Sequence, residues 1–114
     1  MDVSEGLNAT VNDPKLAARL MKVLEPVLGA KEVVDDQRRT VSEDFSEFGR
    51  AGIPSVMVFV GAVKPETYNQ AQQGGEPLPS LHSSKWAPDL APSMRTAILT
   101  EVSAALDLFS TSSR

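Results

Sequence analysis

Apolar residues recur at three- and four-residue steps in two segments of the chain, one near its beginning and one near its end. Because an α-helix has 3.6 residues per turn, such steps place the apolar side chains on one face. The first segment predicts a helix from Pro14 to Leu28, with a buried face made of Leu16, Leu20, Val23, Leu24, Val27 and Leu28. The second predicts a helix beginning after Pro92, with a buried face made of Met94, Ala97, Ile98, Val102, Ala105, Leu106 and Phe109.

The first of these helices has recognisable ends. Either Asn12 or Asp13 is expected to cap the free amide groups at its start, and Pro14 suits the first helical position because it has no N–H. Gly29 is the expected stop. Pro26 lies in the last turn, where we expect it to loosen or bend the helix.

Between the two helices the pattern becomes that of β-strands. Residues 53–60 are apolar on both alternating faces, rich in valine and bounded by Pro54 and Gly61, which is typical of a buried central strand. Residues 31–35, which include Val33 and Val34, are expected to form a short edge strand. The prediction is therefore an α/β fold with a central buried strand flanked by amphipathic helices.

Two further segments surround the predicted central strand. Thr40 and Glu43 fit a capping box, with Ser42 as the competing cap, and either predicts a short helix. That helix should carry two aromatic residues inward and end at a glycine: Phe45 and Phe48, then Gly49 or Gly52. Residues 62–92 are polar and predict a long loop, with a helical turn or two at residues 67–73. Loops of this length are more often functional than idle.

Composition limits the range of functions. The 114 residues suffice for one domain, and the net charge is -4. Basic residues are scattered, so no basic face for nucleic acid is expected, and no apolar run reaches the ~20 residues that span a bilayer. The acidic first residues are unlike a signal peptide, so the cytoplasm is the default location. The absence of cysteine excludes disulfides and thiolate metal ligands.

The candidate chemistry centres on His82, the only histidine. A lone histidine in a loop is more often a surface or hydrogen-bonding residue than a metal ligand. Its position after a predicted buried strand favours a site, because sites collect at the carboxyl ends of strands. Glu43 and Asp44 could bind a metal or act as acid and base, but two acids in a first helical turn are better explained by the helix dipole. No His–acid pattern accompanies Ser80, Ser83 or Ser84, so a serine nucleophile has little support.

Several motifs in order resemble one family. They are ATVNDP at residues 9–14, SEDF at residues 42–45, the apolar segment ending in Gly61, LHS at residues 81–83, and the closing helix. Together they resemble the carboxyl-terminal end of the metal-dependent amidohydrolases, a metallopeptidase family that includes aminoacylase, carboxypeptidase G and hippurate hydrolase. The resemblance runs from about Asn8 to Phe109. Val41 departs from it, because relatives often carry glycine or another very small residue there.

The resemblance implies part of the catalytic domain of a zinc-peptidase-like fold. Residues 1–13 would be the end of a lid-domain strand and the linker back, residues 14–109 the catalytic segment, and residues 110–114 a disordered tail. His82 would be the final metal ligand. The segment Ser42, Glu43 and Asp44 would form the helix start beside the site, as capping groups or as partners of the ligands. The family's other metal ligands, its catalytic glutamate and its lid histidine have no counterpart here, so no catalytic residue is expected in this chain.

We therefore expect the carboxyl-terminal part of a hydrolase that cleaves the amide bond of N-acyl amino acids or small peptides. In the complete enzyme the resemblance implies two divalent ions, Zn or Mn, and we expect none to be stably bound by this chain alone. Its partners would be the missing amino-terminal catalytic segment and lid domain. Without them we expect the chain to expose an apolar patch and to form homodimers, to aggregate or to melt at a low temperature. The alternative is a non-catalytic α/β module that binds without chemistry.

Overall fold

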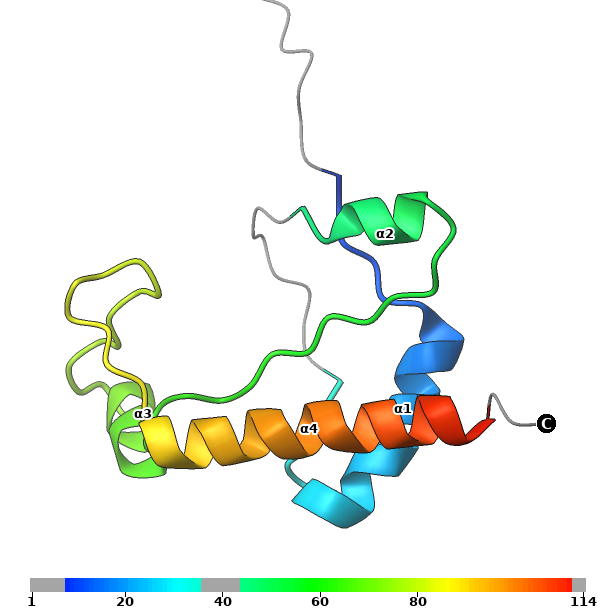
Figure 1. The fold of residues 1–114 in the computed structure, drawn as a ribbon. Helices are drawn as coiled ribbons and strands as arrows, with labels where there is room; N and C mark the ends of the chain where they lie inside the picture. The colour runs from blue at the N-terminus through cyan, green and yellow to red at the C-terminus, as the bar shows by residue number, and fades with distance from the viewer. Residues whose placement is uncertain (1–7, 36–43, 112–114) are drawn as a thin grey trace, which may run out of the picture. The chain divides into compact units, whose positions relative to one another are not determined.

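The structure, a computed structural model, describes residues 8–35 and 44–111. These residues form four helices, which Figure 1 labels: α1 (Pro14–Leu28), α2 (Ser46–Arg50), α3 (Pro65–Gln72) and α4 (Leu90–Thr111). The chain divides into two compact units, Met1–Phe59 with Thr100–Arg114, and Val60–Leu99. Helix α4 is one continuous element whose last half belongs to the first unit.

Helix α1 confirms the first prediction at both ends. The Asp13 carboxylate accepts a hydrogen bond from the Leu16 amide at 2.7 Å, so Asp13 is the cap. Gly29 ends the helix with φ of 101°, in the region that favours glycine, and its amide bonds to the Glu25 carbonyl. The helix continues through Pro26, although Pro26 has no N–H to donate a hydrogen bond to the preceding turn.

The predicted α/β fold is wrong, because the described residues contain no strand and no sheet. Residues 53–60 run as irregular chain between α2 and α3, visible in Figure 1 as the thin green segment. Ile53, Val58 and Phe59 are about half exposed rather than buried. The physical reason is that a strand exists only through a neighbour, and none of the described segments lies beside this one as a second strand.

The predicted edge strand at residues 31–35 is also wrong. Residues 30–32 form a turn after Gly29, fixed by a 3.0 Å hydrogen bond from the Glu32 amide to the Gly29 carbonyl. Residues 33–35 are irregular, and Val34 is exposed. Two adjacent valines favour a strand by propensity, but propensity does not supply the neighbour that a strand needs.

Helix α2 is shorter than predicted. Its first residue is Ser46, and no side chain caps it. The predicted caps Thr40, Ser42 and Glu43 lie outside the described residues. Its carboxyl end is a Schellman motif, in which Gly52 has φ of 78° and the Ile53 amide reaches back to the Phe48 carbonyl.

The aromatic pair on this helix does not form a buried face. The rings of Phe45 and Phe48 lie 5.3 Å apart between centroids, so the two residues contact each other. Phe48 is nevertheless 52% exposed, and the prediction that it points inward is wrong. The buried residue of the helix is Ser46, whose hydroxyl finds no hydrogen-bond partner.

Helix α4 exists as predicted but buries the opposite face. It begins at Leu90, two residues before Pro92, which is tolerated because the first amides of a helix lack partners in any case. The large members of the predicted buried face are about half exposed or more: Met94, Ile98, Val102, Leu106 and Phe109. The less exposed residues of the helix are mostly small or polar: Ser93, Thr96, Ala97, Leu99, Thr100, Ser103, Ala104, Ala105 and Asp107. Of the predicted buried face, only Ala97 and Ala105 are among them. We call the exposed set, together with Leu90, the apolar stripe of α4.

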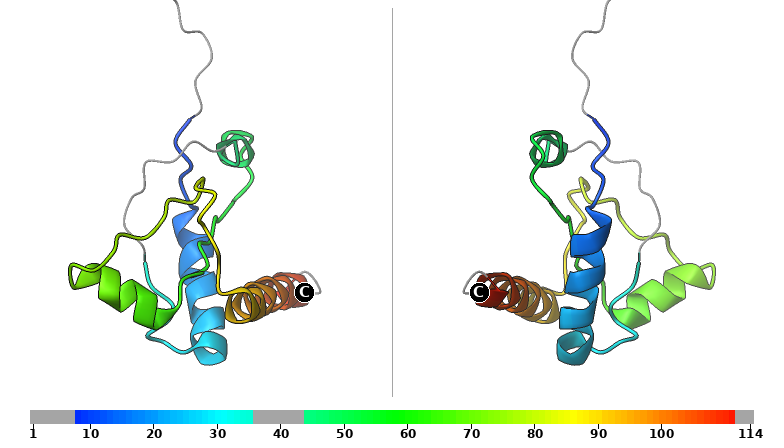
Figure 2. Two further views of the ribbon diagram at one scale, coloured as in Figure 1. Left: turned by 90° about the vertical axis from the view of Figure 1, so that its left-hand side faces the viewer. Right: turned by 90° about the vertical axis from the view of Figure 1, so that its right-hand side faces the viewer.

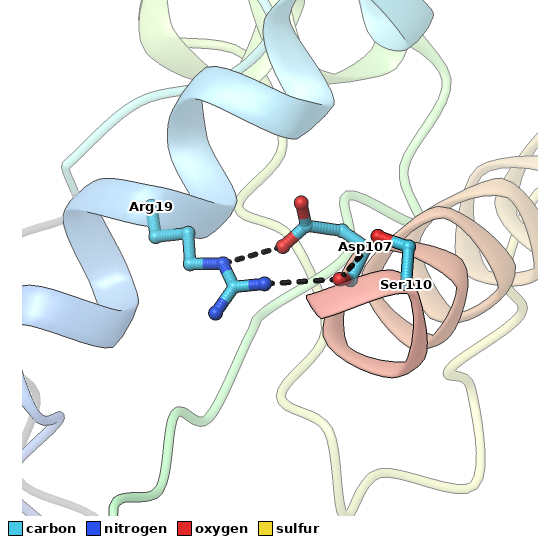
Figure 3. A network of polar contacts seen from close by, with 3 residues as sticks. All are labelled: Arg19, Asp107 and Ser110. Atoms are coloured by element: carbon cyan, nitrogen blue, oxygen red, sulfur yellow. Dashed lines mark hydrogen bonds and ion pairs between the residues drawn. The ribbon is translucent and has the colours of Figure 1, made fainter. Parts of the chain in front are cut away.

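Within the first unit, a polar contact joins α1 to the carboxyl-terminal half of α4. Figures 1 and 2 show α1 crossing the carboxyl-terminal half of α4. The Arg19 guanidinium donates one hydrogen bond to the Asp107 carboxylate at 2.6 Å and a second to the Asp107 carbonyl at 2.9 Å. The Ser110 hydroxyl donates to the same carbonyl, so one residue of α4 receives all three bonds (Figure 3).

Apolar burial in the described residues is small. Only Leu20 and Leu24, both on α1, are buried large apolar residues, with 8% and 5% of their surface exposed. Neither is fully enclosed, and no large side chain among the described residues is. Both of these buried leucines lie in the first unit.

We expect two leucine truncations to separate the buried face from the exposed one. Leu24→Ala should lower the free energy of unfolding by about 2–5 kcal/mol, because it removes a buried side chain and leaves a cavity. Leu106→Ala should change it by no more than about 0.5 kcal/mol, because Leu106 is 66% exposed. Urea unfolding followed by circular dichroism measures both, and equal losses would contradict the assignment of the two faces.

The contact between α1 and α4 gives a second prediction. Arg19→Lys keeps the charge but loses the planar fork that reaches both acceptors of Asp107, so unfolding should become easier by about 0.5–1 kcal/mol for this partly exposed pair. The control is Arg50→Lys, because Arg50 pairs with Glu47 within α2 and both side chains are more than half exposed. That control should leave the urea midpoint unchanged, and an equal shift in both variants would argue against a special role of Arg19.

Candidate functional site

The loop that carries His82 starts from a helix end that requires glycine. Helix α3 ends in a second Schellman motif, in which the Gly75 amide bonds to the Gln70 carbonyl at 2.9 Å and the Gly74 amide to the Ala71 carbonyl. Gly74 has φ of 86°. A Cβ atom on Gly75 would lie 2.7 Å from the Gln70 carbonyl oxygen, so no other residue fits without a shift. The sequence predicted a helical turn or two here, and α3 confirms it.

The other end of the loop is fixed at the start of α4. The Asp89 amide donates to the Ala62 carbonyl at 2.8 Å, and the Ser93 hydroxyl donates to the carbonyls of Asp89 and Gly61. Residues 61 and 62, which follow the predicted strand, therefore lie beside the first turn of α4. Our sequence analysis did not single out Asp89 or Ser93. An aspartate directly before an apolar helix is a start signal that would have placed this boundary.

His82 lies in a pair of consecutive turns within this loop. The Ser83 amide bonds to the Ser80 carbonyl at 2.9 Å, and the Trp86 amide bonds to the Ser83 carbonyl at 3.0 Å. The Ser83 hydroxyl accepts from the Lys85 amide, which ties the second turn together. These bonds fix the backbone on both sides of His82.

The imidazole itself is presented to solvent. His82 is exposed, and its side chain makes no hydrogen bond within residues 8–35 and 44–111. The adjacent Leu81 is 66% exposed. The chain thus holds the backbone of its one histidine in place while leaving both ring nitrogens open to a ligand.

The acidic candidates lie in the other unit. Asp44 is an exposed residue of the first unit, and its carbonyl accepts from the Glu47 amide at 3.1 Å. Its carboxylate does not cap α2, which has no side-chain cap. Ser42 and Glu43 lie outside the described residues. The proximity of His82 to this acidic segment stays a prediction.

The described residues do not make up a hydrolytic metal centre. Such a centre takes three or more protein ligands with an open position. No three histidine, cysteine, aspartate or glutamate side chains within the described ranges gather so as to hold a metal ion. The described part of the chain can therefore contribute the His82 imidazole to a metal site. It does not gather enough ligands to form that site by itself.

Comparison with known proteins leaves the family unassigned. No protein-family model matches the chain, and neither a curated protein nor a solved structure is similar to it. Of the helices described, none combines the length and the apolar character needed to cross a membrane.

We expect glycine to be required at residue 75 and dispensable at residue 49. Gly75→Ala should lower the free energy of unfolding by about 1–3 kcal/mol, because the added methyl group is overpacked against the Gln70 carbonyl. It should also weaken the hydrogen bond from the amide of residue 75 to that carbonyl. Gly49→Ala is the control, because no atom lies within 4 Å of its added methyl group, and alanine favours the helix by about 1 kcal/mol. Amide hydrogen exchange at residues 74 and 75, together with urea unfolding, measures both. Unchanged protection in Gly75→Ala would refute the requirement.

Proposed function

We propose that this chain is the carboxyl-terminal part of a metal-dependent amidohydrolase and that His82 is the metal ligand it contributes. The substrates would be N-acyl amino acids or small peptides with a free carboxylate. The chain itself would carry no catalytic residue. The missing amino-terminal segment and lid domain would be its partners, and a substrate would meet a complete site only when they are joined.

The presentation of His82 is the observation that carries this proposal. The His82 ring is exposed and makes no side-chain hydrogen bond within the described residues, so both of its nitrogens are available to a ligand. Its loop is fixed by the glycine end of α3 and by the contacts of Asp89 and Ser93. Such a setting suits a ligand that must be held ready for a centre assembled from other residues.

The role of the chain's own residues follows from this placement. His82 would bind through a neutral ring nitrogen, and the serine-rich turn around it would hold the backbone still. In the complete enzyme the two ions implied by the resemblance would activate a water molecule and polarise the amide carbonyl. The remaining ligands do not gather within the described residues. The resemblance assigns the general base to a glutamate outside this chain.

A second candidate function is a non-catalytic interaction module. The α/β form of this alternative is wrong, so the module would be helical. The apolar stripe of α4 favours it, because contiguous exposed apolar surface marks interaction sites. The two candidates differ in what the neighbouring coding sequence should hold. A segment with the missing histidines and glutamate plus a lid domain would support the amidohydrolase, and an unrelated protein would support the module.

We expect the purified chain to have no amidase activity, since one imidazole cannot assemble a hydrolytic metal centre. The assay uses hippurate and related N-acyl amino acids with added Zn or Mn, and liquid chromatography detects the released amino acid. Turnover by the purified chain that a chelator abolishes would refute the proposal. No turnover is the expected result.

Co-expression with the protein segment encoded directly upstream tests the positive half of the proposal. The pair should hydrolyse N-acyl amino acids, and His82→Asn should reduce kcat by at least about 100-fold, because it removes a metal ligand. Ser84→Ala is the matched control, since Ser84 is exposed in the same turn and should leave the rate unchanged. Activity that is indifferent to His82, or a pair without activity, would count against the assignment.

A further inference from the structure

Residues 53–59 form no strand, but their backbone runs stretched out between α2 and α3 (Figure 1), and one edge of it is occupied. Alternate residues of an extended chain direct their N–H and C=O groups to the same side. The odd-numbered residues make the bonds: the Ser55 carbonyl accepts from the Asp13 amide at 2.9 Å, and the Met57 amide donates to the Asn12 side chain at 2.8 Å. The Asn12 amide group also donates to the Met57 carbonyl, so one side chain serves both groups of Met57.

The opposite edge of this segment has no hydrogen-bond partner among residues 8–35 and 44–111. The even-numbered Val56 and Val58 make no backbone hydrogen bond to any described residue. Their neighbourhood is also uncharged, since no Asp, Glu, Lys or Arg occurs from residue 51 to residue 63. Val58 and Phe59 are about half exposed. An uncharged, β-branched segment with an unpaired backbone edge is a template for pairing with another extended chain.

We propose that two copies of this chain pair through this edge, antiparallel, with the two-fold axis beside Met57. Val56 of one copy then lies opposite Val58 of the other, and each valine donates one backbone hydrogen bond and accepts one. Met57 faces its own counterpart across the axis as the pair without hydrogen bonds. This dimer goes beyond the proposed function and does not depend on it.

A second copy fits this edge for reasons visible in the chain. Identical neutral segments bring no like charges together, which a self-complementary contact requires. Pro54 has no N–H, so the pairing ends before it and stays short. The other edge is already occupied by Asn12 and Asp13. Each copy therefore offers one edge, and the contact closes at two copies instead of extending into a fibre.

Cysteine substitution tests the register directly, because the natural chain has no cysteine. Met57→Cys places two Cα atoms about 4.5 Å apart across the axis, within the range that a disulfide spans. Ser55→Cys is the matched control on the same face. Its two copies would lie about 13 Å apart, four residues along the strands, which is too far for a disulfide.

The full-length variants are oxidised at equal concentration and separated on a non-reducing gel. Met57→Cys should form the covalent dimer at least about ten times faster than Ser55→Cys, given that only its geometry fits a disulfide. Adding Val58→Pro to Met57→Cys removes a donor from the paired edge and should suppress the crosslink, whereas adding Val58→Thr should retain it. Circular dichroism of the four helices checks that each variant is folded.

Four results would overturn this dimer, and the first three concern the chain by itself. They are equal crosslinking at residues 55 and 57, crosslinking of Met57→Cys that survives Val58→Pro in a folded protein, and a natural chain that sediments as a monomer up to high micromolar concentration. A Met57→Cys chain that crosslinks only to an unrelated extended peptide would assign the edge to a different partner and would also overturn it.

Discussion

The Arg19 guanidinium orients α1 against the carboxyl-terminal half of α4 within the first unit. Only two leucines of α1 are buried there, and apolar contacts have no preferred direction. This burial is therefore too small to fix by itself how α1 lies against the end of α4. Arg19 supplies that direction by bonding both the side chain and the backbone of Asp107. Asp13 and Asn12 act in a similar way at the other end of α1, where they tie the helix start to residues 55 and 57. Polar contacts thus supply the direction that the small amount of packing lacks.

The elements that were predictable from sequence are those governed by local chemistry. The start of α1 at a capping aspartate, its end at Gly29 and the glycine stop of α2 all depend on residues within a few positions. Residues 53–60 failed as a strand because strand formation depends on a distant partner that no local pattern encodes. Helix α4 shows a third case. Periodicity revealed an apolar face, but it could not reveal whether another segment covers that face.

The same distinction between local and distant determinants applies to the candidate site. That His82 stands in a proline-flanked loop was readable from the sequence, and so was the helical turn before it. The contacts of Gly75, Asp89 and Ser93 that fix the loop ends involve carbonyl groups, which have no signature in residue type. The sequence favoured a helix-capping role for Asp44, but α2 begins two residues later and has no side-chain cap. A motif indicates which residue carries the chemistry, whereas the backbone around it decides how that residue is held.

The apolar stripe of α4 affects how cellular chaperones and proteases can recognise this protein. Quality-control chaperones and proteases recognise a continuous row of large apolar side chains as a mark of unfolded chain. On α4 that row is present in the folded state, because the less exposed residues are mostly threonine, serine and alanine, with Leu99 the one large apolar residue among them. Folding alone therefore leaves this row exposed. If a partner covers the stripe, the level of the protein in the cell should depend on that assembly as well as on folding.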